Sequence, residues 1–145
     1  MPIEITRVAP NPPELESGGL DLERLDRAER GRIEAGFPRD KVVLNGTWNV
    51  GDWTFLAGTT RYGSFETTPN NPDNDQTYDA KWLVDLAATY HLDRWSFTLG
   101  GDNVFDEYPE ENIFANSTNG QFPYNSASPF GFNGAYMYAR IGYRW

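Results

Sequence analysis

Residues 80–105 read AKWLVDLAATYHLDRWSFTLGGDNVF and contain two apolar and aromatic runs on either side of a short polar turn at 91–94. Side chains alternate between the two faces of a β-strand, so each run divides into two rows. One row extends from Trp82 to Tyr90 without a charged residue, and its counterpart after the turn begins at Trp95. The pattern predicts two antiparallel strands, Ala80 to Tyr90 and Trp95 to Phe105, each with one apolar face.

Runs of the same kind lie on both sides of this hairpin, at Lys41 to Asn49, Trp53 to Gly63 and Ala135 to Trp145. Each predicted strand has about 9 to 11 residues, which is the length that a tilted strand needs to cross a membrane. Strands of soluble proteins average about 5 to 6 residues. Tight turns at 50–52 and 91–94 alternate with long Asn-, Pro-, Ser- and Gly-rich segments at 64–79 and 106–134. This alternation is typical of outer-membrane barrels.

The two faces of the five predicted strands differ in charge. The uncharged row consists of Val42, Leu44, Gly46, Trp48, Trp53, Phe55, Ala57, Thr59, Trp82, Val84, Leu86, Ala88, Tyr90, Trp95, Phe97, Leu99, Gly101, Ala135, Met137, Ala139, Ile141, Tyr143 and Trp145. The polar row consists of Asn45, Thr47, Thr54, Thr60, Lys81, Asp85, Thr89, Ser96, Thr98, Asp102, Arg140 and Arg144. Arg61 breaks the parity beside a long loop, where a charge near the membrane interface costs little. One lipid-facing row and one lumenal row are therefore expected.

Large aromatic side chains gather at the tight-turn end of the predicted strands. They are Trp48, Trp53, Tyr90, Trp95, Tyr143 and Trp145. Because Trp and Tyr are enriched where a barrel meets the membrane interface, they are expected to form one interfacial belt. The alternative is an aromatic core in a soluble β-sandwich.

Composition excludes several classes of function. The 145 residues carry 12 Lys and Arg against 21 Asp and Glu, a formal net charge of -9, so a phosphate-binding surface for nucleic acid is not expected. The absence of cysteine excludes disulfide scaffolds, thiol catalysis and Cys-based zinc sites. No apolar run of about 18 residues and no signal peptide is evident.

The first forty residues differ from the rest, since they combine prolines at 10, 12 and 13 with crowded charges of both signs. Leu20, Leu22, Leu25 and Ala28 can share one face of a short helix. We expect residues 1–40 to form a loop with a short surface helix, without a specific task indicated, and residues 41–145 to form the strands.

Two stretches resemble a known family. Residues 100–109, GGDNVFDEYP, resemble the Asn-Leu-Phe-Asp segment near the end of TonB-dependent outer-membrane receptors, with Val104 where Leu is commoner. Residues 128–145, SPFGFNGAYMYARIGYRW, resemble that family's closing strand with its terminal aromatic residue. Residues 31–41, GRIEAGFPRDK, resemble less specifically the loop that enters a late strand. The resemblance covers about residues 29 to 145.

The resemblance implies an all-β fold: an antiparallel transmembrane β-barrel, of which this chain supplies about five C-terminal strands out of about 22. It implies that the aromatic end of the last strand, Trp145, Tyr143 and Ile141, is the signal read by the outer-membrane assembly machinery. It implies tight turns in the periplasm and long loops outside the cell. A lumenal polar network that contacts the plug is expected from Lys81, Asp85, Asp102, Arg140 and Arg144.

The implied function is that of part of a TonB-dependent transporter in the outer membrane of a Gram-negative bacterium, without enzymatic activity or a cofactor. Ferric siderophore uptake is the expected transport, with cobalamin or an oligosaccharide as alternatives, and no substrate-binding residue is indicated. The expected partners are membrane lipid, the remaining barrel and plug, the TonB complex and the assembly machinery. The rival from another class is a soluble carbohydrate-binding module whose exposed Trp and Tyr stack on sugars.

Because the plug and signal peptide of that family are not evident, the chain is expected to be a piece of a longer protein, with an unpaired edge on the strand at 41–49. Asp73 to Asp79 resembles a calcium loop but lacks the required Gly and Glu. His91 is the only histidine and has no ligand partners in the sequence. Asp85 and Asp102 fit the lumenal network better than a pair of catalytic carboxylates.

Overall fold

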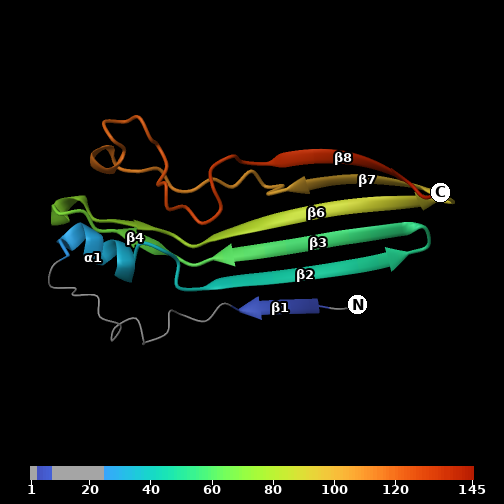
Figure 1. The fold of residues 1–145 in the computed structure, drawn as a ribbon, viewed down its shortest axis with the longest axis horizontal. Helices are drawn as coiled ribbons and strands as arrows, with labels where there is room; N and C mark the ends of the chain where they lie inside the picture. Colours follow the sequence, from blue (N-terminus) through green and yellow to red (C-terminus); the bar gives the residue numbers. More distant parts are fainter. Residues whose placement is uncertain (1–2, 8–24) are drawn as a thin grey trace.

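The computed structural model describes residues 3–7 and 25–145. Its main sheet has six antiparallel strands in the order β1-β2-β3-β6-β7-β8. These strands are β1 (Ile3–Arg7), β2 (Lys41–Val50), β3 (Trp53–Tyr62), β6 (Lys81–Leu92), β7 (Trp95–Asp102) and β8 (Tyr136–Tyr143). Helix α1 (Arg27–Glu34) and a small hairpin of β4 (Phe65–Thr67) and β5 (Gln76–Tyr78) lie beyond one end of the sheet, as Figure 1 shows. Short 3-10 turns occupy Pro72–Asn74 and Phe114–Asn116.

The sheet contains one strand more than the five expected from the sequence. β1 pairs with β2 from Ile3 opposite Gly46 to Arg7 opposite Val42. The expectation of an unpaired β2 edge is therefore wrong over 42–46, and residues 3–7 belong to the sheet rather than to a loop. The sequence pattern missed β1 because a strand of 5 residues is far shorter than a membrane crossing.

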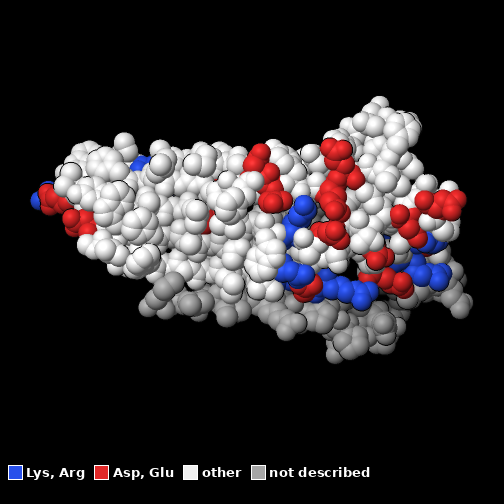
Figure 2. All heavy atoms as spheres, turned by 180° about the vertical axis from the view of Figure 1, so that it is seen from behind, with Lys and Arg blue, Asp and Glu red and all other residues white. Residues whose placement is uncertain are grey.

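Backbone register confirms the division of the strands into two faces. Directly opposed residues share a face, and Trp53 lies opposite Tyr90, Tyr90 opposite Phe97 and Phe97 opposite Ile141. Seen from behind, the strand region shows almost no Lys, Arg, Asp or Glu atoms, whereas charged side chains gather beside α1 and the long loops (Figure 2). The uncharged row is thus continuous across the sheet.

Arg61 lies on the uncharged face, opposite Val42 and Trp82. The alternation of side chains along β3 predicts this position. Its guanidinium forms an ion pair with the Asp40 carboxylate, which follows the end of α1 in the chain. The one charge in this row therefore has a partner at the loop end of the sheet.

Two-residue turns join the hairpins at the opposite end of the sheet. Gly51 opens the first turn with φ 56° and Asp93 opens the second with φ 52°, a conformation that Gly adopts freely and Asp tolerates. Ladder bonds continue past both turns, from the His91 N–H to the Asp52 carbonyl (2.8 Å) and from the Arg144 N–H to the Arg94 carbonyl (2.9 Å). No helix in the described part of the chain is long and apolar enough to cross a membrane.

Strands β2, β3, β6, β7 and β8 bury no large apolar side chain among the described residues. The buried hydrophobic side chains of the described residues are Phe65 (6% exposed) and Tyr78 (2%), both in the small hairpin, whereas Trp48, Leu99 and Ile141 are 63%, 63% and 68% exposed. Figure 1 shows the sheet as a single layer. A soluble sandwich would cover one face with a second sheet, so this arrangement favours an apolar face that meets lipid.

Candidate ligand pocket in the long loops

The two long loops are joined into one unit by hydrogen bonds centred on Gln76. Its Nε2 donates to the Glu111 carbonyl (2.7 Å), and its Oε1 accepts from the Ile113 N–H (2.9 Å). The Asn116 Nδ2 also approaches the Gln76 Oε1 (3.3 Å). One side chain of β5 therefore holds three residues of the second loop.

Tyr78 makes the neighbouring link from the same strand. Its buried ring stacks on Phe65 with centroids 4.6 Å apart, and its hydroxyl donates to the Asn112 Oδ1 (2.6 Å). The Asn112 Nδ2 in turn donates to the Phe122 carbonyl (3.0 Å). Farther along the loop, Asn125 donates to the Thr67 Oγ1 (2.7 Å), so β4 and β5 both anchor the second loop.

Helix α1 is fastened to the same hairpin. Asp26 caps it, with the Asp26 side chain accepting from the Glu29 N–H and the Glu29 side chain accepting from the Asp26 N–H, an arrangement that satisfies two helix-end donors. Arg27 forms a two-point ion pair with Asp75 (2.8 and 2.6 Å). The Ala28 N–H donates to the Asn70 Oδ1 (3.1 Å). The predicted surface helix with Leu20, Leu22, Leu25 and Ala28 on one face lies partly outside the described residues, and Leu25 precedes the cap, so only Ala28 of these four belongs to α1. Helix α1 forms one wall of the loop unit instead of a free surface helix.

Gly31 allows this close approach. A Cβ at Gly31 would overlap the Thr68 hydroxyl, so a larger residue would push α1 away from the hairpin. The Thr68 Oγ1 is buried and has no hydrogen-bond partner among the described residues.

Three carboxyl groups in this unit shape its electrostatics. The hydrogen bond from Arg27 lowers the pKa of Asp75, and the same bond raises the pKa of Arg27. The pKa of Asp26 is lowered chiefly by the hydrogen bond from the Glu29 backbone and then by the Asn70 side chain. The negative charge of Asp106 raises the pKa of Tyr108. Asp26 and Asp75, the two carboxyl groups with lowered pKa values, hold α1 against the hairpin. The attachment of α1 therefore depends on the ionised form of both groups.

A cavity of about 770 Å³ opens between α1, β4 and the second loop. Its walls are aromatic and amide-rich, with one basic and one acidic side chain. The residues that carry this character are Arg32, Phe37, Glu66, Asn112, Asn116, Phe122, Tyr124, Asn125 and Phe132. Predominantly apolar walls with a few polar groups are typical of small-molecule sites. We name this cavity the loop pocket.

The segment at 102–106, which carries the family resemblance, directs the chain from β7 into the second loop. Asn103 (φ 50°) and Asp106 (φ 59°) both adopt the left-handed conformation. The Asn103 Nδ2 donates to the Glu107 carbonyl (2.8 Å), and its Oδ1 accepts from the Glu107 N–H (3.0 Å). The Asp106 Oδ1 accepts from the Ala135 N–H (2.8 Å) where the loop returns. β7 therefore ends at Asp102, three residues before the predicted limit at Phe105.

The predicted aromatic belt is assembled at the turn end of the sheet. Trp53 packs on Tyr90 (centroids 4.9 Å apart) and Trp95 packs on Tyr143 (4.8 Å), while Trp48 lies 6.1 Å from Phe55. Ile141 lies opposite Phe97, and Trp145 follows β8 with 99% of its surface exposed. The geometry groups these side chains, and their interfacial and assembly roles stay predictions.

The five predicted lumenal residues are spread along one face of the sheet, and no hydrogen bond or ion pair links them to one another within the described residues. The Lys81 Nζ pairs with the Glu107 carboxylate (3.6 Å), and the Asp85 Oδ1 accepts from the Asn103 N–H (2.8 Å). Arg140 lies over the Tyr138 ring (5.9 Å), and Asp102 is exposed opposite Tyr136. Arg144 lines a small hollow of about 270 Å³ with His91 and Arg94. A network would need groups from outside the described residues.

The geometry supports neither a calcium site at Asp73 to Asp79 nor a metal site at His91. In the described part of the chain, no group of three or more His, Asp or Glu side chains could hold a metal ion. In the segment 73–79, Asp75 is held by Arg27. His91 approaches the Thr54 hydroxyl through Nε2 (3.2 Å).

The pocket residues were missed at the sequence level. Asn112, Asn116 and Asn125 lie in a segment whose Asn and Gly content indicates only a loop. A signal was present in the aromatic residues at 114, 122, 124, 130 and 132, which are unusual in a solvated connection. Such residues mark a loop that packs or binds.

Comparison with known proteins agrees with this architecture. A family model described as TonB dependent receptor-like, beta-barrel, matches residues 16–104. The chain belongs to the TonB-dependent receptor β-barrel family, whose members are outer-membrane receptors and transporters of Gram-negative bacteria and are not enzymes.

Two solved structures are similar to this chain. One is FpvA of P. aeruginosa bound to heterologous pyoverdines, with 26% identity, a TM-score of 0.52 and coverage of 72% of this chain. The other is the complex of FpvAI with pyocin S2, with 24% identity, a TM-score of 0.55 and coverage of 76%. The chain spans 14% of the length of each. Among curated protein sequences, none matches this chain.

Proposed function

We propose that this chain supplies six barrel strands and two external loops to a transporter that imports a ferric siderophore across the outer membrane. The observation that carries the proposal is the continuous uncharged row on one face of a single-layer sheet. Lipid covers such a row in an outer-membrane barrel. The likeness to a pyoverdine-bound FpvA supports a siderophore as substrate.

The polar face supports the same proposal, because it would face the lumen. Thr89 and Thr98 share a hydrogen bond across neighbouring strands (2.9 Å), and Arg140 lies opposite Thr98 in the next strand. A plug within the barrel would meet these hydroxyl and guanidinium groups. The TonB complex would then act on the whole transporter, and the assembly machinery would read the end at Ile141, Tyr143 and Trp145.

Uptake by cells tests this function. A strain that lacks the full-length gene carrying this sequence should lose energy-dependent uptake of at least one radioiron-loaded siderophore, and the wild-type gene should restore uptake. Loss of uptake must be reproduced by removing TonB. Unchanged uptake of a broad siderophore panel, under iron limitation that induces the gene, would contradict the siderophore proposal.

A further inference from the structure

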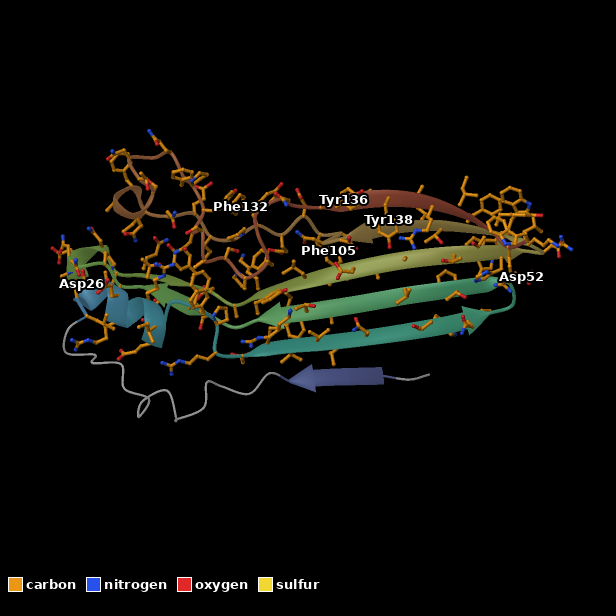
Figure 3. All side chains as sticks on the ribbon, viewed as in Figure 1. Asp26, Asp52, Phe105, Phe132, Tyr136 and Tyr138 are labelled. Carbon is orange, nitrogen blue, oxygen red and sulfur yellow. The ribbon has the colours of Figure 1, made fainter. Side chains whose placement is uncertain are left out.

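We propose that Asn133 is a site of spontaneous covalent modification, at which the following residue, Gly134, converts the Asn side-chain amide into Asp or isoAsp. The pair lies where the second loop returns to β8, and its flanking residues Phe132 and Tyr136 are labelled in Figure 3. The inference is independent of what the transporter carries, because it depends only on the chemistry of this chain.

The reaction needs no reagent except water. The Gly134 backbone nitrogen attacks the Asn133 Cγ and loses its proton, the Cγ–Nδ2 bond breaks, and ammonia leaves with that proton. Water then opens the resulting succinimide ring, which gives Asp when one ring carbonyl is attacked and isoAsp when the other is attacked. The attack is intramolecular, so its rate depends on how freely the nitrogen and the amide can meet. A following Gly favours it, because no side chain shields the nitrogen.

The chain contains three Asn-Gly pairs, at 45–46, 119–120 and 133–134. Local sequence therefore offers three candidates of the same kind. The structure separates them by the surroundings of the Gly nitrogen.

At the third pair, both reacting groups are available. Asn133 is exposed and precedes β8, outside any helix or strand. Within the described residues, neither its side-chain amide nor the Gly134 N–H forms a hydrogen bond. The next N–H along the chain, that of Ala135, is the one that donates to the Asp106 Oδ1 (2.8 Å). The Gly134 nitrogen can therefore attack without first losing a hydrogen bond.

The packing around Gly134 also requires a residue without a side chain. Gly134 has φ 69°, and a Cβ at this position would overlap the Tyr108 hydroxyl and the Asp106 carboxylate. The contacts that direct the loop into β8 thus place the residue that favours the reaction directly after Asn133.

The pair at 119–120 is exposed as well, but its nitrogen is engaged. The Gly120 N–H donates to the Ser117 Oγ (2.8 Å). Ser117 is only 3% exposed, and its hydroxyl donates to the Phe114 carbonyl (2.7 Å). This hydrogen bond must break before the Gly120 nitrogen can attack, so Asn119 should react more slowly than Asn133.

The pair at 45–46 lies within the sheet. Asn45 is opposite Glu4 of β1 and Gly58 of β3, so strands hold the backbone on both sides. Ring closure would have to disturb this ladder, and Asn45 should react most slowly of the three.

Conversion of Asn133 should alter the junction between the second loop and β8. The loop segments 63–80 and 103–135 contain acidic residues but no Lys or Arg, so a new carboxylate at 133 meets uncompensated negative charge, including that of Asp106. IsoAsp also adds a main-chain atom between the loop and the strand. Both changes should weaken the contact of Asp106 with the Ala135 N–H.

The test uses the full-length protein, folded in detergent and incubated in mildly alkaline heavy-oxygen water. Peptide mass spectrometry should show conversion of Asn133 at least about fivefold faster than that of Asn119, the ratio that one net hydrogen bond supports, with Asn45 the slowest. Heavy oxygen marks conversion during the incubation, and isoAsp marks the succinimide route. S117A, which removes the acceptor of the Gly120 N–H, should accelerate Asn119 and leave Asn133 unchanged.

The same protein unfolded in urea is the matched control. All three pairs then have the same following residue and no folded partner, so their rates should be similar. Equal rates of Asn133 and Asn119 in the folded protein, a ranking that persists in urea, an Asn119 rate unchanged by S117A, or product at Asn133 without isoAsp would overturn the inference. Radioiron uptake tests the proposed function separately, because neither outcome depends on the other.

Discussion

Asn103 combines a positive φ, two side-chain hydrogen bonds and a backbone hydrogen bond at the end of β7. It adopts φ 50°, it closes a two-bond ring with the Glu107 backbone, and its own N–H donates to Asp85. Asn is among the few residues that tolerate the left-handed region. The family-like segment at 102–106 therefore sets the direction in which the chain leaves β7 and enters the second loop.

Replacing Asn103 separates these contributions. N103A should lower the free energy of unfolding of the full-length protein by about 1 to 3 kcal/mol, because the partly buried backbone N–H and carbonyl of Glu107 lose their hydrogen bonds. N103G restores the conformational freedom but not the bonds, so it should recover only part of the loss. Thermal unfolding in detergent measures both. Full recovery in N103G would show that backbone conformation alone requires Asn.

At the scale of elements, the attachment of α1 depends on ionised carboxylates. Because their folded-state pKa values are lowered, Asp75 and Asp26 favour the docked helix fully above their ordinary unfolded pKa values, and this contribution is lost as the pH falls through the lowered ones. Acid should therefore release α1 from the hairpin, while neutral and mildly alkaline conditions should leave it docked.

A spin label tests this release. The chain has no cysteine, so R30C gives one labelling site in this part of the full-length protein once any cysteine elsewhere is removed. Its mobility should rise as the pH falls below the ordinary range of an Asp carboxyl. With D75N added, the label should already be mobile at neutral pH and respond less to acid. A pH response unchanged by D75N would assign the attachment to other contacts.

The two faces of β6 lead to a second prediction at this scale. Leu86 lies on the uncharged row, where Arg near the bilayer centre costs about 2 to 4 kcal/mol. L86R should therefore reduce folding into liposomes, whereas T89R, on the polar face of the same strand, should be tolerated. Folding yield as a function of urea concentration measures the difference. Equal losses in both variants would refute the assignment of faces.

The strands were predictable because period-two alternation is a local property. Lys41–Val50 and Trp53–Tyr62 differ from their predicted limits by one residue each. The β4–β5 hairpin was not predictable, since its strands have three residues each and depend on Phe65 stacking on Tyr78. The loop pocket could not be predicted from local sequence patterns either. Gln76 and Asn112 form hydrogen bonds between segments that lie more than thirty residues apart in the chain.

At the scale of the whole molecule, the sheet has two incomplete edges. β1 covers β2 only from Val42 to Gly46, and β8 has one strand neighbour, β7, among the described residues. Unpaired backbone groups are costly in hydrocarbon, so a membrane position requires further strands at both edges. A chain that spans 14% of the FpvA structures is consistent with one sector of such a barrel.

The direction of that sector in the membrane is the last prediction. The loop unit and the two tight turns lie at opposite ends of the long strands (Figures 1 and 3), so one end should face outside the cell and the other the periplasm. Long loops lie outside and short turns in the periplasm in barrels of this kind. With single cysteines in the full-length protein, A115C should react with a membrane-impermeant thiol reagent on intact cells, whereas D52C should react only after the outer membrane is opened. Both positions are exposed, so accessibility depends on sidedness, and labelling of D52C alone on intact cells would invert the topology and place the loop pocket in the periplasm.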